Sequence, residues 1–148
     1  MAMMSIAADI IKFFQAFIRQ MAKVGGKNLP KTISTSLGAE LAKAYQKRDI
    51  QEWKIAVTGL IEGEGGKLEI IETSNSCILK TQHPSDFCPV GGKMDPAHFE
   101  IVTESLCRPY MRGFLKGFEK IVTKIPPITK CIVRDGGSLC EVTYEFEK

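Results

Sequence analysis

Five cysteines and two histidines are the side chains of this 148-residue chain best suited to bind a metal or to act as a nucleophile. Thiolates and imidazoles are ligands that zinc prefers, and a thiolate beside an imidazole can attack a substrate. The residues concerned are Cys77, Cys88, Cys107, Cys131, Cys140, His83 and His98. An odd number of cysteines argues against a disulfide framework. A buried structural thiol is the ordinary explanation of any single cysteine, so a functional site requires several of them to meet.

The loop HPSDFCPVGGKMDP, residues 83–96, places Cys88 between prolines and a pair of glycines. Such residues form tight turns that fix the direction of a side chain. Cys88 is therefore a metal ligand, a nucleophile with His83 or His98 as its base, or a small residue in a turn. No C-x-x-C spacing and no nucleophile motif decides between these alternatives, so the positions of the other cysteines must.

Helices dominate the N-terminal part of the chain. Apolar side chains at helical spacing predict helices over residues 1–24 and 34–46, and a third that begins at Asp49. Glu52 follows Asp49 at the spacing of a capping box, and the run EGEGG ends the third helix near residue 62.

Strands and one long helix follow. The alternating segments KLEIIET and CILKTQ predict a β-hairpin. A long helix is expected over residues 96–124, with a kink at Pro109. The segment ITKCIVRDGGSLCEVTYEF predicts a second hairpin, which turns at residues 135–137. We therefore expect a single α+β domain over residues 1–148, in which an antiparallel sheet of hairpins packs against helices.

The helix over residues 1–24 is amphipathic, and its broad apolar face predicts a homodimer. The side chains that define this face are Phe13, Phe14, Phe17 and Ile18. Lys12 and Arg19 interrupt the apolar residues, so we expect neither a signal peptide nor a membrane span, and a cytoplasmic location. Nucleic acid is not an expected partner, because a net charge of +3 with interleaved signs is too mild.

Gly113 and Gly117 lie four residues apart in the long helix, beside Tyr110 and Phe114. Each glycine costs roughly 1 kcal/mol of helix stability relative to alanine. That cost is acceptable where another backbone or a ligand comes close, and both explanations remain open. A small hydrophobic ligand is expected to lie against these four residues, with the Tyr110 hydroxyl orienting its polar end.

The segments CRPYMRGFLKGFEKI and CIV…GGSLCEVTYEF together resemble the 4-vinyl reductase domain. This small-molecule-binding module is found in archaeal hydrocarbon-binding proteins and in phenol-sensing transcriptional activators. SLGAELAKAYQ and EGEGGKLEIIETSNSCIL are also similar to that family, and the resemblance covers roughly residues 35–146. It implies a domain that binds a hydrocarbon or aromatic ligand.

The resemblance also implies a structural zinc ion bound by Cys107, Cys131 and Cys140. The family often has a glutamate ligand three residues before the first hairpin cysteine, where this chain has Ile128. A closed zinc site has four protein donors, so we expect Cys88 to complete it, with His83 in reserve.

The alternative function is a cysteine-dependent enzyme, or a reductase that acts on a tetrapyrrole or another hydrophobic substrate. The run EGEGG precedes a strand rather than following one, which is the wrong order for a dinucleotide-binding turn. We therefore favour a binding domain over an enzyme and expect no catalytic residue. Cys77 lies among the apolar residues of an expected strand and is an ordinary core thiol.

Overall fold

The protein is a mixed helix and sheet structure, as the sequence predicts. The computed structural model describes the backbone of residues 2–148 and the side chains of residue 13 and residues 15–148. The strands are β1 (Lys67–Glu72), β2 (Ser76–Gln82), β3 (Ile128–Lys130) and β4 (Leu139–Glu145). The helices are α1 (Ala2–Gly25), α2 (Asn28–Lys47), α3 (Trp53–Gly63), α4 (Phe99–Val102), α5 (Arg108–Gly117) and α6 (Ile132–Asp135).

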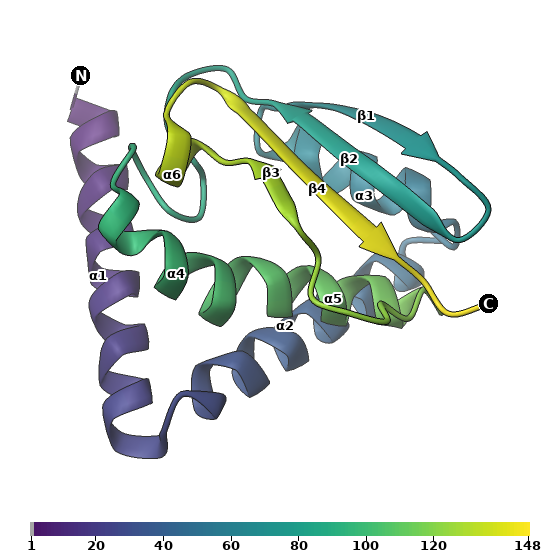
Figure 1. Ribbon diagram of the computed structural model, residues 1–148, viewed down its shortest axis with the longest axis horizontal. Coiled ribbons are helices and arrows are strands. Elements are labelled where there is room, and N and C mark those ends of the chain that lie inside the picture. The colour runs from purple at the N-terminus through teal and green to yellow at the C-terminus, as the bar shows by residue number, and fades with distance from the viewer. Residues whose placement is uncertain (1) are drawn as a thin grey trace.

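All four strands form one antiparallel sheet in the order β1-β2-β4-β3. In Figure 1, α3 lies behind β1 and β2, the continuous helix from α4 to α5 runs below the sheet, and α1 stands apart at the other end. The largest fully buried side chains include Phe114 and Leu115 of α5 and Val57 of α3, which meet the inner face of the sheet. The core therefore lies between the sheet, α3 and α5.

The first hairpin is confirmed, because β1 and β2 pair from Lys67 with Gln82 to Glu72 with Cys77. The second hairpin also forms, since β3 pairs with β4, and the chain turns at Gly136 and Gly137 as predicted, but the first strand is shorter than expected and ends at Lys130. The short helix α6 lies between the two strands, and Cys131 precedes it in an extended conformation instead of lying on a strand. The Asp135 carboxylate accepts a hydrogen bond from the Cys131 N–H at 3.0 Å and so closes this helical turn.

Two predicted helix starts were wrong. The second helix begins at Asn28 rather than at residue 34, because Pro30 lies in its first turn, where a backbone N–H is not needed. The third helix is capped by Glu52, whose carboxylate accepts from the Ile55 N–H at 3.1 Å. Asp49 instead has φ of 64° in the loop before it.

The long helix before the C-terminal strands is present and is irregular at Pro109, as expected. A 3₁₀ turn (Pro96–His98), α4, a π-helical turn (Thr103–Cys107) and α5 follow without a break. Pro109 has no N–H to offer the carbonyl of Ser105, four residues earlier. The Ser34 hydroxyl of α2 donates to that carbonyl instead, in a buried hydrogen bond of 2.6 Å.

The predicted end of the long helix near residue 124 was wrong, because α5 ends at Gly117. Phe118 and Lys120 both donate their N–H groups to the Leu115 carbonyl, and Glu119 has φ of 64°. Val122 then pairs with Phe146 as an isolated bridge, so its apolar side chain reaches the core from an irregular segment.

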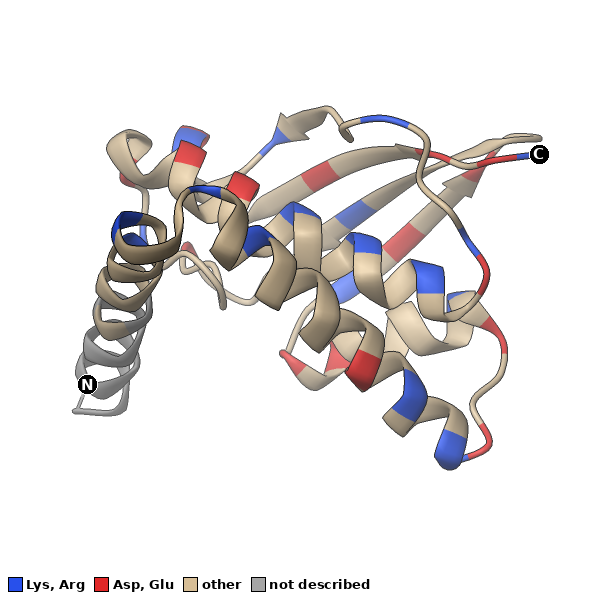
Figure 2. Cartoon of the chain, turned by 90° about the horizontal axis from the view of Figure 1, so that it is seen from below, with Lys and Arg blue, Asp and Glu red and all other residues tan. Residues whose placement is uncertain are grey.

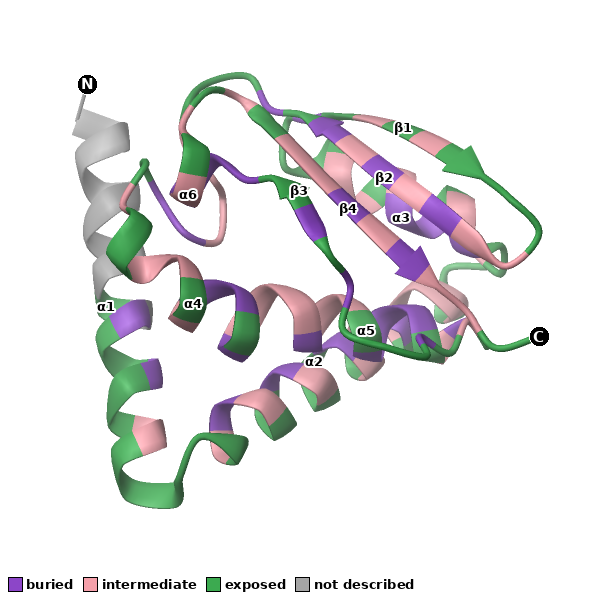
Figure 3. Cartoon of the chain, viewed as in Figure 1, coloured by how far each residue is buried: buried purple, intermediate pink, exposed green. Residues whose placement is uncertain are grey.

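The part of α1 whose side chains the structure describes has a narrow buried stripe and is mostly exposed (Figure 3). Ile18, expected on the apolar dimer face, is instead buried within the chain. The amide of Gln15 donates to the carbonyl of Gly91 at 3.1 Å, which ties α1 to the loop after β2. Phe13 and Phe17 are exposed, whereas the side chain of Phe14 lies outside the described residues. No helix in the described part of the chain is long and apolar enough to cross a bilayer.

Candidate metal centre

Four of the five cysteines line one small enclosed cavity. Cys88 comes from the loop after β2, Cys107 from the π-helical turn, Cys131 from the residue before α6, and Cys140 from β4. The cavity measures about 30 Å³, which is room for a water molecule or a single ion. The rest of its wall consists of His83, Thr103 and the aliphatic side chains Val90, Val102, Ile128, Ile132 and Val133. Segments far apart in sequence thus bring four cysteines to the wall of one cavity.

The loop after β2 holds Cys88 through its own backbone. The N–H and carbonyl of Cys88 form two hydrogen bonds of 2.8 Å with Gly92, and the Gly91 N–H donates to the Cys88 sulfur at 3.3 Å. Gly92 adopts φ of 85°, which favours glycine. A β-carbon at Gly91 would lie 2.5 Å from Val133, so this loop packs closely against the core. The proline and glycine pattern therefore fixes the backbone that carries Cys88.

His83 is the only buried side chain among the described residues whose nitrogen lacks a partner. Its Nδ1 atom has no hydrogen bond, while its backbone N–H donates to the Ser138 carbonyl at 2.8 Å. Burial lowers the pKa of His83, so the imidazole is neutral and able to bind a metal. His98 does not line this cavity, and its Nδ1 lies 3.1 Å from a carboxylate oxygen of Asp95 on the partly exposed 3₁₀ turn.

Burial raises the thiol pKa of three cysteines of the cavity, Cys88, Cys107 and Cys140. Burial, together with the negative charges that Cys88 and Cys131 would carry as thiolates, raises the pKa of Cys107 to about 12. Burial and the same kind of repulsion raise the pKa of Cys140 further. Burial also raises the pKa of Cys88, although the backbone N–H groups of the loop oppose it. An activated nucleophile has a lowered pKa, so these values argue against a thiolate enzyme.

A divalent cation would favour the thiolate over the neutral thiol, because a thiol that coordinates a metal ion loses its proton. Four sulfur donors, or three sulfurs and an imidazole, are a donor set that suits zinc. Within residue 13 and residues 15–148, however, no three His, Cys, Asp or Glu side chains are already arranged to hold an ion. Zinc binding would therefore require these side chains to rotate. Ile128, where the resemblance led us to look for a glutamate ligand, lines the same cavity and offers no donor.

Cys77 lies elsewhere, as expected. It is almost fully buried in β2 among core residues, and burial raises its pKa to about 11. One residue near the cysteines was not predicted. The negative charge of Glu64, the residue after α3, adds to the larger effect of burial in raising the pKa of Cys107 and of Tyr110. Its only sequence signal is its place in the run EGEGG.

The four residues expected to bind a hydrophobic ligand do not share one environment. A β-carbon on Gly113 would lie 2.0 Å from the Thr35 carbonyl oxygen, and one on Gly117 would lie 2.4 Å from the β-carbon of Ala42. Both glycines therefore allow α5 to approach α2. Phe114 is fully buried and Tyr110 is half-buried. Close helix packing explains the glycines, and a ligand at these residues stays a prediction.

A scan of the chain against protein-family models finds no match, and a search of curated proteins finds no significant relative. The resemblance to the 4-vinyl reductase domain therefore remains an expectation drawn from the sequence.

Proposed function

We propose that this protein is a small-molecule-binding domain whose fold is held together by a structural zinc ion. The observation that carries the proposal is the convergence of Cys88, Cys107, Cys131 and Cys140 on one enclosed cavity. Four cysteines from four separate segments around one cavity are an unusual way to fill a core, and they are the donor set of a closed zinc site. The neutral His83 beside them is the reserve ligand.

The role of the ion is structural. Bound zinc supplies a positive charge that turns neutral thiols into thiolate ligands and cross-links the segments that bear them. Those segments are the loop after β2, the π-helical turn, the start of α6 and β4. Aliphatic contacts join them, and the Asp95 N–H of the loop also donates to the Val133 carbonyl of α6 at 2.8 Å. With four protein donors no position remains open for a reacting water, so the site stabilises the fold and performs no reaction.

The ligand is a small hydrocarbon or aromatic molecule, as the resemblance implies. Tyr110 supports this part of the proposal, because it is half-buried and near both Glu64 and Tyr45, whose charges raise its pKa after the larger effect of burial. A phenol in such a place can orient the polar end of an otherwise apolar ligand. The expected compartment is the cytoplasm, where thiols stay reduced and free to bind metal.

The homodimer is part of the same proposal and rests on α1. Phe13, Phe17 and Val24 are 67%, 52% and 85% exposed. At 100° per residue these three positions fall within 40° of one another, on the side of the helix opposite to the buried Gln15. An apolar face of this kind suits burial against the same face of a second copy.

Elemental analysis of untagged protein tests the zinc site. We expect about one equivalent of zinc per chain, and less than about a tenth of an equivalent of any transition metal would refute the proposal. Cys140→Ser should lose the metal and lower thermal stability markedly. Cys77→Ser is the matched control, since Cys77 is buried in β2 outside the cavity, and it should keep its zinc.

A further inference from the structure

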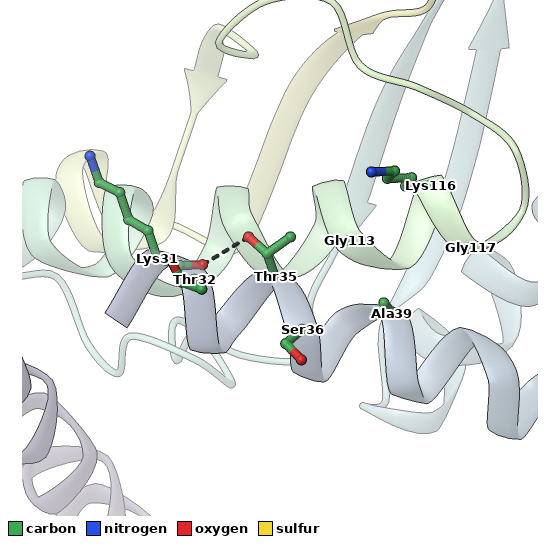
Figure 4. A pocket seen from close by; sticks show the side chains of 8 residues that line it. All are labelled: Lys31, Thr32, Thr35, Ser36, Ala39, Gly113, Lys116 and Gly117. Carbon is green, nitrogen blue, oxygen red and sulfur yellow. Dashed lines mark hydrogen bonds between the residues drawn. The ribbon is translucent and has the colours of Figure 1, made fainter. Parts of the chain in front are cut away.

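A trough runs along the outer side of the contact between α2 and α5. It consists of two adjoining hollows of about 590 Å³ and 310 Å³, which share Lys31 and Thr35 and which we call the α2–α5 trough. The first hollow is lined by Lys31, Thr32, Thr35, Ser36, Ala39, Gly113, Lys116 and Gly117 (Figure 4). The second is lined by Lys31, Thr35, Glu104, Arg108, Pro109, Arg112, Ile125 and Pro126. Its floor of small residues results from the close approach of the two helices.

The trough carries more positive than negative charge. Its four basic side chains are Lys31, Arg108, Arg112 and Lys116, and its one acidic side chain is Glu104. Basic residues also follow one another along the underside of the molecule, as Figure 2 shows. Among the residues that the structure describes, none of these four basic groups has an acidic partner within salt-bridge distance.

The spacing of the bases has an energetic cost. Arg108, Arg112 and Lys116 are each four residues apart on α5, so they lie on one face of the helix. Like charges at this spacing destabilise a helix by about 0.2–0.5 kcal/mol per pair. An anionic group bound in the trough would offset this repulsion, so anion binding would explain why the basic side chains lie in one row on α5.

Arg108 lines the second hollow and is held by a hydrogen bond. Its Nε–H donates to the Pro126 carbonyl at 3.0 Å, which fixes the plane of the half-buried guanidinium. Neither of its terminal nitrogens donates to another described residue. A guanidinium held in this way offers two parallel N–H groups to two oxygens of one phosphate. In Figure 4, Lys31 extends from α2 and Lys116 from α5, with Thr35 between them.

The wall beside Arg108 is apolar. Pro109 and Pro126 are buried beneath it, and Ile125 is 74% exposed at the rim of the same hollow. An inorganic anion would leave this surface uncovered, whereas an alkyl or similar substituent would bury it. We propose that the α2–α5 trough binds a phosphate ester that bears an apolar substituent, with Arg108 holding the phosphate and Lys31 and Arg112 neutralising its second charge. The ester is a soluble phosphomonoester or the headgroup of an anionic lipid, which present the same chemistry.

Isothermal titration of the full chain with n-hexyl phosphate at low salt tests the proposal, and we expect binding stronger than that of inorganic phosphate. Arg112→Gln, which removes an exposed side chain without a hydrogen bond of its own, should weaken binding about tenfold. Arg108→Lys keeps the positive charge but loses the two parallel N–H groups of the guanidinium, and it should also weaken binding about tenfold. Glu104→Gln removes the one repelling charge in the trough and should strengthen binding.

Arg19→Gln is the matched control, because it makes the same change of net charge on α1, away from the trough. The proposal would be overturned if Arg19→Gln lost as much affinity for n-hexyl phosphate as Arg112→Gln. It would also be overturned if the protein bound neither n-hexyl phosphate at millimolar concentration nor vesicles. Vesicles of phosphatidylcholine with and without phosphatidic acid distinguish the two sources, since only a lipid headgroup site binds them selectively. A glutamate-rich peptide that binds more tightly than the ester, with the same dependence on Arg112, would show a protein-docking surface instead. Zinc content measured on each variant separates these outcomes from the metal site.

Discussion

Substituting alanine for Gly113 should test how closely the two central helices approach. The contact is reciprocal, because a β-carbon on Gly113 would lie 2.0 Å from the Thr35 carbonyl oxygen and one on Gly38 would lie 2.0 Å from the Tyr110 carbonyl oxygen. Ordinary van der Waals contact begins near 3.4 Å. Both partners are backbone atoms, so no side-chain rotation can relieve the overlap. The helices would have to separate by more than about 1 Å.

The cost of that separation can be estimated from the packing around it. Overpacking of a core typically destabilises a protein by about 1–3 kcal/mol, and a clash with backbone lies at the upper end. Alanine has a higher helix propensity than glycine, which offsets roughly 1 kcal/mol of this destabilisation. We therefore expect Gly113→Ala to lower the free energy of unfolding by about 2 kcal/mol, which corresponds to a fall in Tm of roughly 4–8 °C for a chain of this length.

Gly59→Ala is the control for this experiment. Gly59 lies in α3, and a β-carbon there would meet no atom within 4 Å. The same change should therefore stabilise the protein by about 0.5–1 kcal/mol through helix propensity alone. Thermal and urea unfolding followed by circular dichroism measure both variants. A Gly113→Ala protein as stable as the Gly59→Ala protein would show that the helices are not in contact and would reopen the ligand explanation of the glycines.

Three further predictions concern the metal, the loop cysteine and the dimer. Burial raises the thiol pKa values, with Cys107 at about 12, so zinc binding at neutral pH should release protons into a weak buffer. The zinc affinity should then rise about tenfold per pH unit for each proton released. An affinity that does not depend on pH would contradict thiolate ligation. Native iodoacetamide labelling should spare Cys88 until a chelator is added, and fast labelling of the untreated protein would favour catalysis instead. Light scattering at micromolar concentration should give twice the chain mass of 16.4 kDa, and Phe17→Glu should give the monomer; a monomeric wild type would exclude the dimer.

The sequence predicted those elements whose side chains repeat regularly. The alternation in β1 and β2 and the helical pattern around Pro109 were sufficient, because burial of one face imposes the period. The same rule misplaced the end of the long helix. Val122 continues the helical spacing and is buried, yet it reaches the core from an irregular segment after Glu119. Apolar spacing shows that a residue is buried but does not show which backbone carries it.

The candidate site was less predictable than the fold. Cys131 was expected on a strand, and the helical turn of α6 that follows it depends on a hydrogen bond from its N–H to the Asp135 carboxylate. The direction of Cys88 depends on backbone hydrogen bonds with Gly92 and on the close packing of Gly91 against Val133. The residue types of these segments suggest turns, but the spacing of residues in the sequence does not specify the tertiary contacts that the turns make. The trough left no signal in the sequence beyond the basic residues of α5, because its floor forms only when α2 and α5 meet.

The π-helical turn before Pro109 is where the proposed metal site and the proposed anion site come together. Cys107 is the last residue of this turn and lines the cysteine cavity, while the next residue, Arg108, lines the trough on the α2 side of α5. Successive side chains on a helix diverge by about 100°, so neighbouring residues can serve opposite sides of one element. Pro109 makes the turn irregular, and the Ser34 hydrogen bond to Ser105 ties it to α2. Since π-helical turns occur frequently at functional sites, one irregularity in the backbone explains how both side chains are positioned.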